Sequence, residues 1–309
     1  MRETTPAGTR LDADTLHARL DARNWRRVAV VECCDSTQTI VRRLADEAGD
    51  RGWWLALADQ QTAGRGRAGA AWFSPAGTAL HLSLGCRIAL PLAVLPRASL
   101  VVGLAVARVL AAALQIAIGL KWPNDLMLRD STQHWRKVAG ILCEADATAP
   151  RASATGAGGA SAETAWFAGI GLNVSTPIAA FPAALRSHVA SLCEATAAPI
   201  DRTELAARLA NAVRDAVGAW QDGGGALPCE AIDEMLCFRN ELVDLDDGRE
   251  TAETVVLRGV DASGWLRVQT PSGAELGPER VARPLAIVAA HGDPAWRAPA
   301  ALAVQPAPT

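Results

Sequence analysis

The sequence has no excess of positive charge and no uninterrupted apolar stretch of membrane-spanning length. Its 309 residues carry a net charge of −3, whereas nucleic-acid-binding proteins usually concentrate basic residues on one face. The most apolar segment, residues 95–120, is Ala-rich and contains Arg97, Arg108 and Gln115. A buried helix is favoured over a membrane span. Neither a nucleic acid nor a membrane is expected as a partner.

Paired-cysteine motifs and a secretion signal are also absent. The number of cysteines, seven, is odd, no C-x-x-C pair occurs, and the first residues lack the apolar core of a signal peptide. Reduced thiols and a cytoplasmic location are predicted. The adjacent Cys33 and Cys34 are typical of packing rather than of chemistry.

Neither common nucleotide-binding fingerprint occurs in its proper context. A G-x-G-x-x-G pattern is formed by Gly64, Gly66 and Gly69. The turn-forming residues 72–77 follow it in place of the required helix, and no Gly-Lys-Ser/Thr is present. What remains is a Gly-rich loop with two guanidinium groups, Arg65 and Arg67, which suits binding of phosphate or carboxylate. A solvated turn with two surface arginines is equally consistent with the loop alone.

Apolar periodicity and turn residues predict alternating helices and strands over the first two thirds of the chain. Predicted helices cover residues 11–23, 35–48 and 201–220, the last beginning with Asp201 and Glu204 as a capping box. Predicted strands cover residues 28–31, 53–58, 80–84, 138–145 and 166–174, and the alternation in 80–84 indicates a half-buried strand. Residues 146–164 are rich in Ala, Gly, Ser and Thr, which predicts a flexible loop between the last two strands.

Composition divides the chain into four expected segments. Residues 1–27 form an N-terminal lead, disordered over 1–10, and residues 28–225 form the main domain. Turn signals at 247–248, 263–264 and 272–273 predict a small β-barrel over residues 235–288. The Pro- and Ala-rich residues 289–309 are expected to be a disordered tail.

Two further segments contain residue types suited to acyl or phosphoryl transfer. Residues 121–125, Lys-Trp-Pro-Asn-Asp, end a predicted strand in a turn, and Lys137 precedes an apolar strand that would hold its ammonium group rigidly. An ammonium group beside phosphate oxygens neutralises charge that develops during transfer. Asp125 could orient a lysine, position a metal or cap the turn. In isolation, an ordinary turn is the more common explanation of residues 123–125.

Two glycines, Gly169 and Gly171, lie one residue apart inside a predicted apolar strand. Such spacing indicates close approach by a ligand or by another backbone segment. A β-bulge beside a packed helix is the alternative.

In their order along the chain, these motifs resemble those of biotin–protein ligases. The resemblance rests on Asp35-Ser36-Thr37, the Gly64–Arg67 loop that ends at Trp72, Lys121–Asp125, Lys137–Leu142 and Gly169–Asn173. It covers about residues 28–290, and the Lys-Trp-Pro-Asn-Asp block is its most specific part. It implies an α/β (α+β) catalytic domain over residues 28–225, with a mixed central sheet flanked by helices, like class II synthetases and biotin–lipoate ligases. An SH3-like β-barrel would follow over residues 235–288.

The resemblance also implies a reaction in two steps. The biotin carboxylate attacks the α-phosphate of ATP to form biotinyl-5′-AMP and pyrophosphate, and a lysine of a biotin carboxyl carrier domain then attacks the mixed anhydride and releases AMP. ATP and biotin would be substrates, Mg²⁺ is expected with ATP although no sequence motif shows a metal site, and a homodimer is compatible with the family. A mobile Gly-rich lid suits an intermediate that water would hydrolyse.

Roles for individual residues come from the same resemblance. Lys137, Arg67 and Asp125 would be catalytic: Lys137 and Arg67 would contact the phosphate or carbonyl oxygens, and Asp125 would orient the incoming lysine. The implied substrate-binding residues are Ser36, Thr37, Gln61, Gly64, Arg65, Gly66, Gly69, Trp72, Lys121, Trp122, Asn124, Gly140, Gly171 and Asn173, with Ser36, Thr37 and Gln61 at the biotin head group.

The chain departs from the family pattern in three places. Ala70 and Ala71 stand where many relatives carry a further basic residue, which predicts a looser lid and leakage of the adenylate. The segment between Asp125 and Lys137, at residues 129–136, looks longer than usual. Only about 27 residues precede the first core strand, whereas a winged helix-turn-helix domain needs about 60, so the monofunctional ligase type is expected.

Two other functions are consistent with parts of the pattern. A lipoate or octanoyl ligase or transferase shares the architecture, but the Gly-Arg-Gly-Arg loop and the Lys-Trp-Pro-Asn-Asp block favour biotin. A non-catalytic biotin-sensing module would not need to keep Arg67, Asp125 and Lys137.

Overall fold

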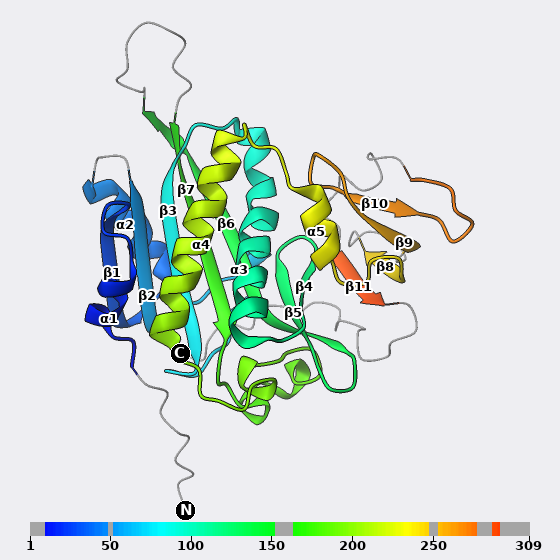
Figure 1. The fold of residues 1–309 in the computed structure, drawn as a ribbon, viewed down its shortest axis with the longest axis horizontal. Coiled ribbons are helices and arrows are strands. Elements are labelled where there is room, and N and C mark those ends of the chain that lie inside the picture. Colours follow the sequence, from blue (N-terminus) through cyan, green and yellow to red (C-terminus); the bar gives the residue numbers. More distant parts are fainter. Residues whose placement is uncertain (1–9, 49–51, 152–162, 247–252, 277–285, 291–309) are drawn as a thin grey trace, which may run out of the picture.

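A seven-stranded mixed sheet forms the body of the protein in a computed structural model that describes residues 10–48, 52–151, 163–246, 253–276 and 286–290 (Figure 1). Its strand order is β1-β2-β3-β7-β6-β5-β4. The strands are β1 Trp25–Cys34, β2 Trp53–Gln61, β3 Ala79–Ile88, β4 Ile118–Lys121, β5 Asp125–Arg129, β6 Trp135–Arg151 and β7 Glu163–Asn173. Only β1 and β2 pair in parallel, because a helix crosses over between them, whereas the other neighbours are antiparallel. The predicted mixed sheet with flanking helices is confirmed.

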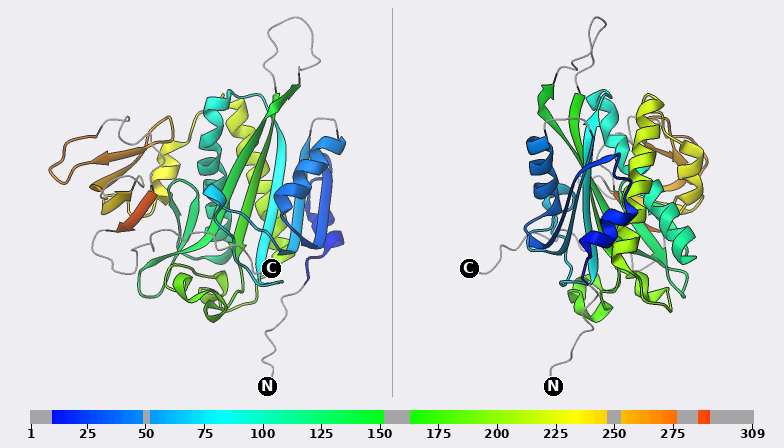
Figure 2. Two further views of the ribbon diagram at one scale, coloured as in Figure 1. Left: turned by 180° about the vertical axis from the view of Figure 1, so that it is seen from behind. Right: turned by 60° about the vertical axis from the view of Figure 1, so that its left-hand side comes forward.

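Helices cover both faces of this sheet (Figure 2). Helix α2 (Thr37–Ala48) lies on one face, and α3 (Ala98–Leu114) and α4 (Arg202–Asp222) lie together on the other. Along β2, Leu55 and Leu57 belong to the large core on the α3–α4 side, whereas Trp54 and Ala56 belong to a smaller cluster beneath α2. Both faces of the central strands are thus covered, and these residues make β2 apolar on both sides.

The strand predicted at residues 80–84 is present as part of β3, but the prediction that only one of its faces is buried is wrong. His81 is 1% exposed and Ser83 is fully buried. The alternation is real, but the polar face of β3 turns toward α2 and an adjoining pocket instead of toward solvent. Polar residues at alternate positions therefore marked the floor of a site.

The helix predicted within residues 11–23 is confirmed, and it packs on the main body. Residues Ala13–Arg19 form α1, whose cap Asp12 accepts a hydrogen bond from the Thr15 backbone N–H. Leu16 is fully buried, and α1 packs against α4 (Figure 2). The segment is part of the main body because its three leucines complete the core around α4. Residues 1–9 lie outside the described residues.

The apolar segment predicted as a buried helix forms α3, preceded by the 3₁₀ helix Leu92–Arg97. Together they are long and apolar enough to cross a membrane by length and composition alone. Within the fold α3 packs beside α4 and against strands β4, β5 and β6, which explains its apolar composition. The helix ends at Leu114, earlier than the apolar segment, because Gln115 adopts a left-handed conformation with φ 53°.

The C-terminal part is a separate four-stranded sheet, ordered β10-β9-β8-β11 (Figure 1). After the short helix α5 (Cys229–Met235), its strands are β8 Leu242–Asp246, β9 Glu253–Val260, β10 Leu266–Gln269 and β11 Ala286–Ala290. It is attached to the main body where the Cys237 backbone N–H donates to the Leu120 carbonyl at 2.8 Å. The predicted short strands are confirmed. The predicted loop 146–164 is wrong at both ends, because β6 continues to Arg151 and β7 begins at Glu163, and the predicted tail 289–309 is wrong at its start, because β11 continues to Ala290. Residues 152–162 and 291–309 lie outside the described residues.

Candidate functional site

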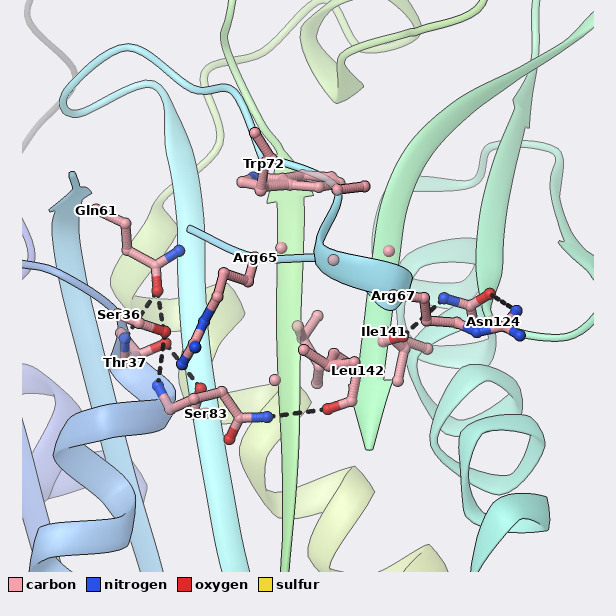
Figure 3. Close-up of a pocket in the computed structure, with 18 of the residues that line it drawn as sticks. Ser36, Thr37, Gln61, Arg65, Arg67, Trp72, Ser83, Asn124, Ile141 and Leu142 are labelled. Atoms are coloured by element: carbon pink, nitrogen blue, oxygen red, sulfur yellow. Dashed lines mark hydrogen bonds between the residues drawn. The ribbon is translucent and has the colours of Figure 1, made fainter. Parts of the chain in front are cut away.

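A pocket of about 240 Å³ lies on the α2 face of the sheet, between the N-terminus of α2 and the loop that follows β2 (Figure 3). Strands β3, β7 and β6 form its floor. Its lining residues are Ser36, Thr37, Gln38, Gln61, Arg65, Gly66, Arg67, Ala70, Ala71, Trp72, Ser83, Asn124, Asp125, Lys137, Gly140, Ile141, Leu142, Gly169, Ile170 and Gly171.

One end of the pocket is a closed group of hydrogen-bonding side chains (Figure 3). Gln61 Oε1 accepts from the Thr37 backbone N–H at 2.8 Å and from the Thr37 hydroxyl at 3.0 Å. The Thr37 and Ser83 hydroxyl oxygens are 2.7 Å apart. Both Thr37 and Ser83 are buried. These groups are held rigidly because β2, β3 and the start of α2 each supply one of them.

Trp72 lies across the strands as a roof over the floor glycines (Figure 3). A Cβ atom at Gly171 would lie 2.6 Å from the Trp72 ring, and one at Gly140 would lie 3.2 Å from it. The two glycines therefore make room for the indole. The buried Trp72 Nε1 has no hydrogen-bond partner among the described residues.

The Gly-rich loop places its two arginines differently (Figure 3). Arg65 extends into the pocket toward Thr37 and Ser83, whereas Arg67 reaches the opposite side and donates to Asn124 Oδ1 at 3.2 Å. Asn124 is itself held by its Nδ2, which donates to the Ile141 carbonyl at 2.8 Å. Two exposed guanidinium groups thus border a single small cavity.

An ion pair lies at the same side of the pocket. Lys137 Nζ is 2.7 Å from Asp125 Oδ1 and 5.7 Å from the centre of the Trp72 ring. Asp125 on β5 is opposite Gly140 on β6, and the Lys137 ammonium lies over that glycine, where an added Cβ would be 3.3 Å from Nζ. Burial lowers the pKa of the neighbouring Lys121 to about 8, with Asp125 opposing and Lys137 reinforcing the shift.

The structure brings twelve of the predicted site residues together. Around the pocket lie Ser36, Thr37, Gln61, Arg65, Gly66, Arg67, Trp72, Asn124, Asp125, Lys137, Gly140 and Gly171. Segments from residue 36 to residue 171 converge because the start of α2 and the loop after β2 lie over the central strands β3, β7 and β6.

Five other predicted residues do not line the pocket. Gly64 is buried beneath it, where an added Cβ would lie 3.0 Å from Gln61 Nε2, and Gly69 is in the loop with φ 77°. Lys121 lies behind Asp125 and Lys137. Trp122 turns away, and its Nε1 donates to the Gly264 carbonyl at 2.9 Å. Asn173 is buried and donates to the Ala190 carbonyl at 3.0 Å.

Eight lining residues were not among the predicted site residues, although the spacing of Gly169 and Gly171 predicts close approach by a ligand or a backbone segment. These are Gln38, Ala70, Ala71, Ser83, Ile141, Leu142, Gly169 and Ile170 as pocket residues. Gln38 is the second residue of α2, and its Nε2 donates to the Leu142 carbonyl at 3.0 Å. Ser83 could have been found from the polar alternation along its strand. Ile141 and Leu142 read only as strand residues, since nothing in their type separates a pocket floor from a core.

Asp125 is the single carboxylate among the residues that line the pocket, and it is paired with Lys137. No cluster of three or more His, Cys, Asp or Glu side chains suited to a metal occurs among the described residues. These residues do not by themselves form a Mg²⁺ site.

Comparison with known proteins gives consistent matches. The model of the biotin/lipoate A/B protein ligase family matches residues 30–154. The chain is 43% identical over 136 residues to the bifunctional ligase/repressor BirA of Salmonella typhimurium, a match that covers 43% of this chain and 39% of that relative. In this match the chain therefore spans well under half of that relative's length.

Longer matches extend over most of the chain. Identity to BirA of Escherichia coli is 32% over 261 residues, which covers 84% of this chain and 73% of that protein. A mutant biotin protein ligase of Aquifex aeolicus, solved in complex with biotin, superimposes with a TM-score of 0.62 at 25% identity, over 81% of this chain and 95% of that one. Sequence and fold agree, and the chain belongs to the biotin/lipoate A/B protein ligase family.

Proposed function

We propose that this protein is an ATP-dependent biotin–protein ligase. It would join biotin to AMP and then transfer the biotinyl group to one lysine of a biotin carboxyl carrier domain. The observation that carries the proposal is the closed polar end of the pocket, where Thr37, Gln61 and Ser83 form a fixed hydrogen-bonding group. The relatives named as ligases and the biotin complex of the structural neighbour support it.

Ligand chemistry favours biotin over lipoate. The biotin head group is a cyclic urea with two N–H donors and one carbonyl acceptor, whereas the dithiolane ring of lipoate offers none of these. A buried polar group left without a partner costs about 1–3 kcal/mol, so the polar end would reject a purely apolar ring.

The opposite side of the pocket suits the two transfer steps. In the first, a carboxylate oxygen of biotin bonds to the α-phosphorus of ATP, and pyrophosphate leaves. In the second, the carrier amine bonds to the biotinyl carbonyl carbon, loses a proton, and AMP leaves. Arg67 and Lys137 would neutralise negative charge on the phosphate and carbonyl oxygens. Asp125 would orient first Lys137 and then the incoming amine. These groups also distinguish the ligase from a module that only senses biotin, which would not require them.

The proposal extends to the surroundings of the site. Trp72 and the loop from Gly64 to Ala71 would cover the adenylate and exclude water. Mg²⁺ is expected to enter with the nucleotide phosphates. An SH3-like C-terminal domain, a homodimer, a cytoplasmic location and no nucleic-acid partner complete the prediction.

The decisive experiment incubates the full chain with a carrier domain, biotin and MgATP, and follows the carrier by mass spectrometry. We expect the mass of one biotinyl group on a single lysine, and with Lys137→Ala a rate lower by about 10²–10³. The carrier and the enzyme differ in mass, so self-labelling at either of the enzyme's two lysines, Lys121 and Lys137, cannot be mistaken for transfer. Lipoate in place of biotin is the control. Transfer of lipoate alone would assign the protein to the sister activity, and no transfer of either would favour a sensor.

A further inference from the structure

The polar end of the pocket continues behind Gln61 into side chains that the proposed reaction does not use. Gln61 Nε2 lies 3.2 Å from His81 Nδ1, and His81 Nε2 lies 2.9 Å from Ser74 Oγ. His81 is 1% exposed and is opposite Gly171 in the β3–β7 ladder. A row of hydrogen bonds therefore runs from Ser83 through Thr37, Gln61 and His81 to Ser74.

The direction of each bond behind Gln61 follows from one fixed donor. The Thr37 backbone N–H can only donate, so the Gln61 atom 2.8 Å away is the carbonyl Oε1. The amide Nε2 must then face His81 and donate to Nδ1. An imidazole whose Nδ1 accepts carries its proton on Nε2, which donates to Ser74.

The surroundings of His81 keep its imidazole uncharged. Burial, followed by the charge of nearby Arg202, lowers the pKa of His81 to about 4, with Asp59 opposing the shift. Arg202 is fixed in place by its 2.5 Å contact with Asp59 and by a hydrogen bond to the Ala79 carbonyl. A protonated His81 would turn an N–H of Nδ1 toward the Gln61 amide N–H, which the row cannot accommodate.

On the other side of Gln61, the donors among the Thr37 and Ser83 hydroxyl groups are also determined. The Thr37 hydroxyl donates its one proton to Gln61 Oε1 at 3.0 Å. The 2.7 Å contact with Ser83 must therefore be donated by the Ser83 hydroxyl. With both protons committed within the row, the Thr37 and Ser83 oxygens can serve a ligand only as acceptors.

We propose that His81 is a positioning residue for recognition of the head group. By accepting from Gln61 Nε2, it holds the amide in the one orientation that makes Thr37 and Ser83 acceptors for the N–H groups of a cyclic urea. With the amide reversed, Nε2 would oppose the Thr37 N–H and would drive the Thr37 hydroxyl to donate toward Ser83. The inference rests on the proposed function, because the cyclic urea is the head group of biotin.

Two substitutions test the roles of the two imidazole nitrogens of His81 separately. In H81N, the amide oxygen can replace Nδ1 as the acceptor for Gln61. In H81Q, the amide nitrogen can replace Nε2 beside Ser74, but the acceptor toward Gln61 is lost. By isothermal titration calorimetry on the full chain, we expect H81N to bind biotin within about threefold of wild type and H81Q to bind at least about tenfold more weakly. In steady-state assays the KM for biotin should rise in H81Q while the KM for ATP stays unchanged.

A Gln61→Ala background controls for damage to the buried site. Without the Gln61 amide, H81N and H81Q should bind biotin equally, because His81 acts through that amide. A difference that persists there would overturn the inference. So would equal affinities of H81N and H81Q in the wild-type background, whether both were retained or both lost. A wild-type protein that binds no biotin would instead overturn the proposed function itself.

Discussion

At the scale of single residues, Gly171 shows how little space the pocket leaves. A side chain there would meet the Trp72 ring at 2.6 Å, and a rigid indole roof can yield only by moving away from the floor. Gly171→Ala should therefore displace Trp72, lower the free energy of unfolding by about 1–3 kcal/mol and weaken biotin binding. Urea denaturation and calorimetric titration measure the two effects.

Gly218 supplies the matched control for this substitution. It lies in α4, and an added Cβ would meet nothing within 4 Å. Gly218→Ala should raise the free energy of unfolding by about 0.5–1 kcal/mol, because alanine loses less conformational entropy in a helix. Destabilisation by both substitutions alike would show that the clash with Trp72 is not the cause at Gly171.

The lowered pKa of Lys121 predicts that the stability of the protein depends on pH. Burial lowers its pKa from 10.5 to about 8, against the attraction of Asp125 and Cys237 and with repulsion from Lys137. Between these two pH values the unfolded chain binds a proton that the folded chain has lost, so the free energy of unfolding should rise with pH. The rise is at most about 1.4 kcal/mol per pH unit, and well below the folded pKa of about 8 this contribution is constant because both states are protonated.

Urea denaturation at about pH 8 and about pH 10 tests this sign in wild type and in Lys121→Met. The variant should lack the part of the rise that Lys121 contributes. An identical pH dependence in the two proteins would mean that Lys121 keeps its ordinary pKa in the folded state.

At the scale of elements, α1 shows that a short amphipathic helix can belong to the core. Leu16 is fully buried against α4, whereas Leu92, before α3, is 53% exposed. Leu16→Ala should lower the free energy of unfolding by about 2–5 kcal/mol, and Leu92→Ala by no more than about 0.5 kcal/mol. Comparable losses from the two variants in thermal or urea unfolding would contradict the packing of α1.

Elements also show where sequence patterns are sufficient. Strands β6 and β7 were predictable because apolar runs of strand length end in Gly- and Ser-rich residues, and α4 because its cap Asp201 accepts from two backbone N–H groups. The short strands β4 and β5 were read as one strand end and a loop. They pair through a tight turn at Trp122–Asn124, and residues that favour turns do not reveal whether the chain continues as a hairpin.

At the scale of the whole molecule, Trp122 joins the C-terminal sheet to the main body. Its Nε1 donates to the Gly264 carbonyl at 2.9 Å, and its ring lies 6.3 Å from that of Trp265. Trp122→Phe keeps an aromatic ring but removes the donor, so the free energy of unfolding should fall by about 1–3 kcal/mol. The loss should be largest in the C-terminal segment, which hydrogen exchange by mass spectrometry can resolve.

Trp220 is the control, since it is similarly buried but its Nε1 has no hydrogen-bond partner among the described residues. Trp220→Phe removes an indole of the same size without breaking a hydrogen bond. Should the two variants lose equal stability, and protection in the C-terminal sheet stay unchanged in Trp122→Phe, the contact with Gly264 would have no role in holding the sheet.

Local sequence determined the helices, the main strands and the chemical character of the site, because periodicity, caps and Gly-rich loops act over a few residues. Lys137, Asp125 and Arg67 could be selected as candidates on that basis. Tertiary structure alone decided that Trp72 roofs the floor glycines, that Trp122 turns to the C-terminal sheet, and that His81 stands behind Gln61. Those placements depend on which strands become neighbours and in which register, and contacts between residues distant along the chain leave no mark in any short stretch of sequence.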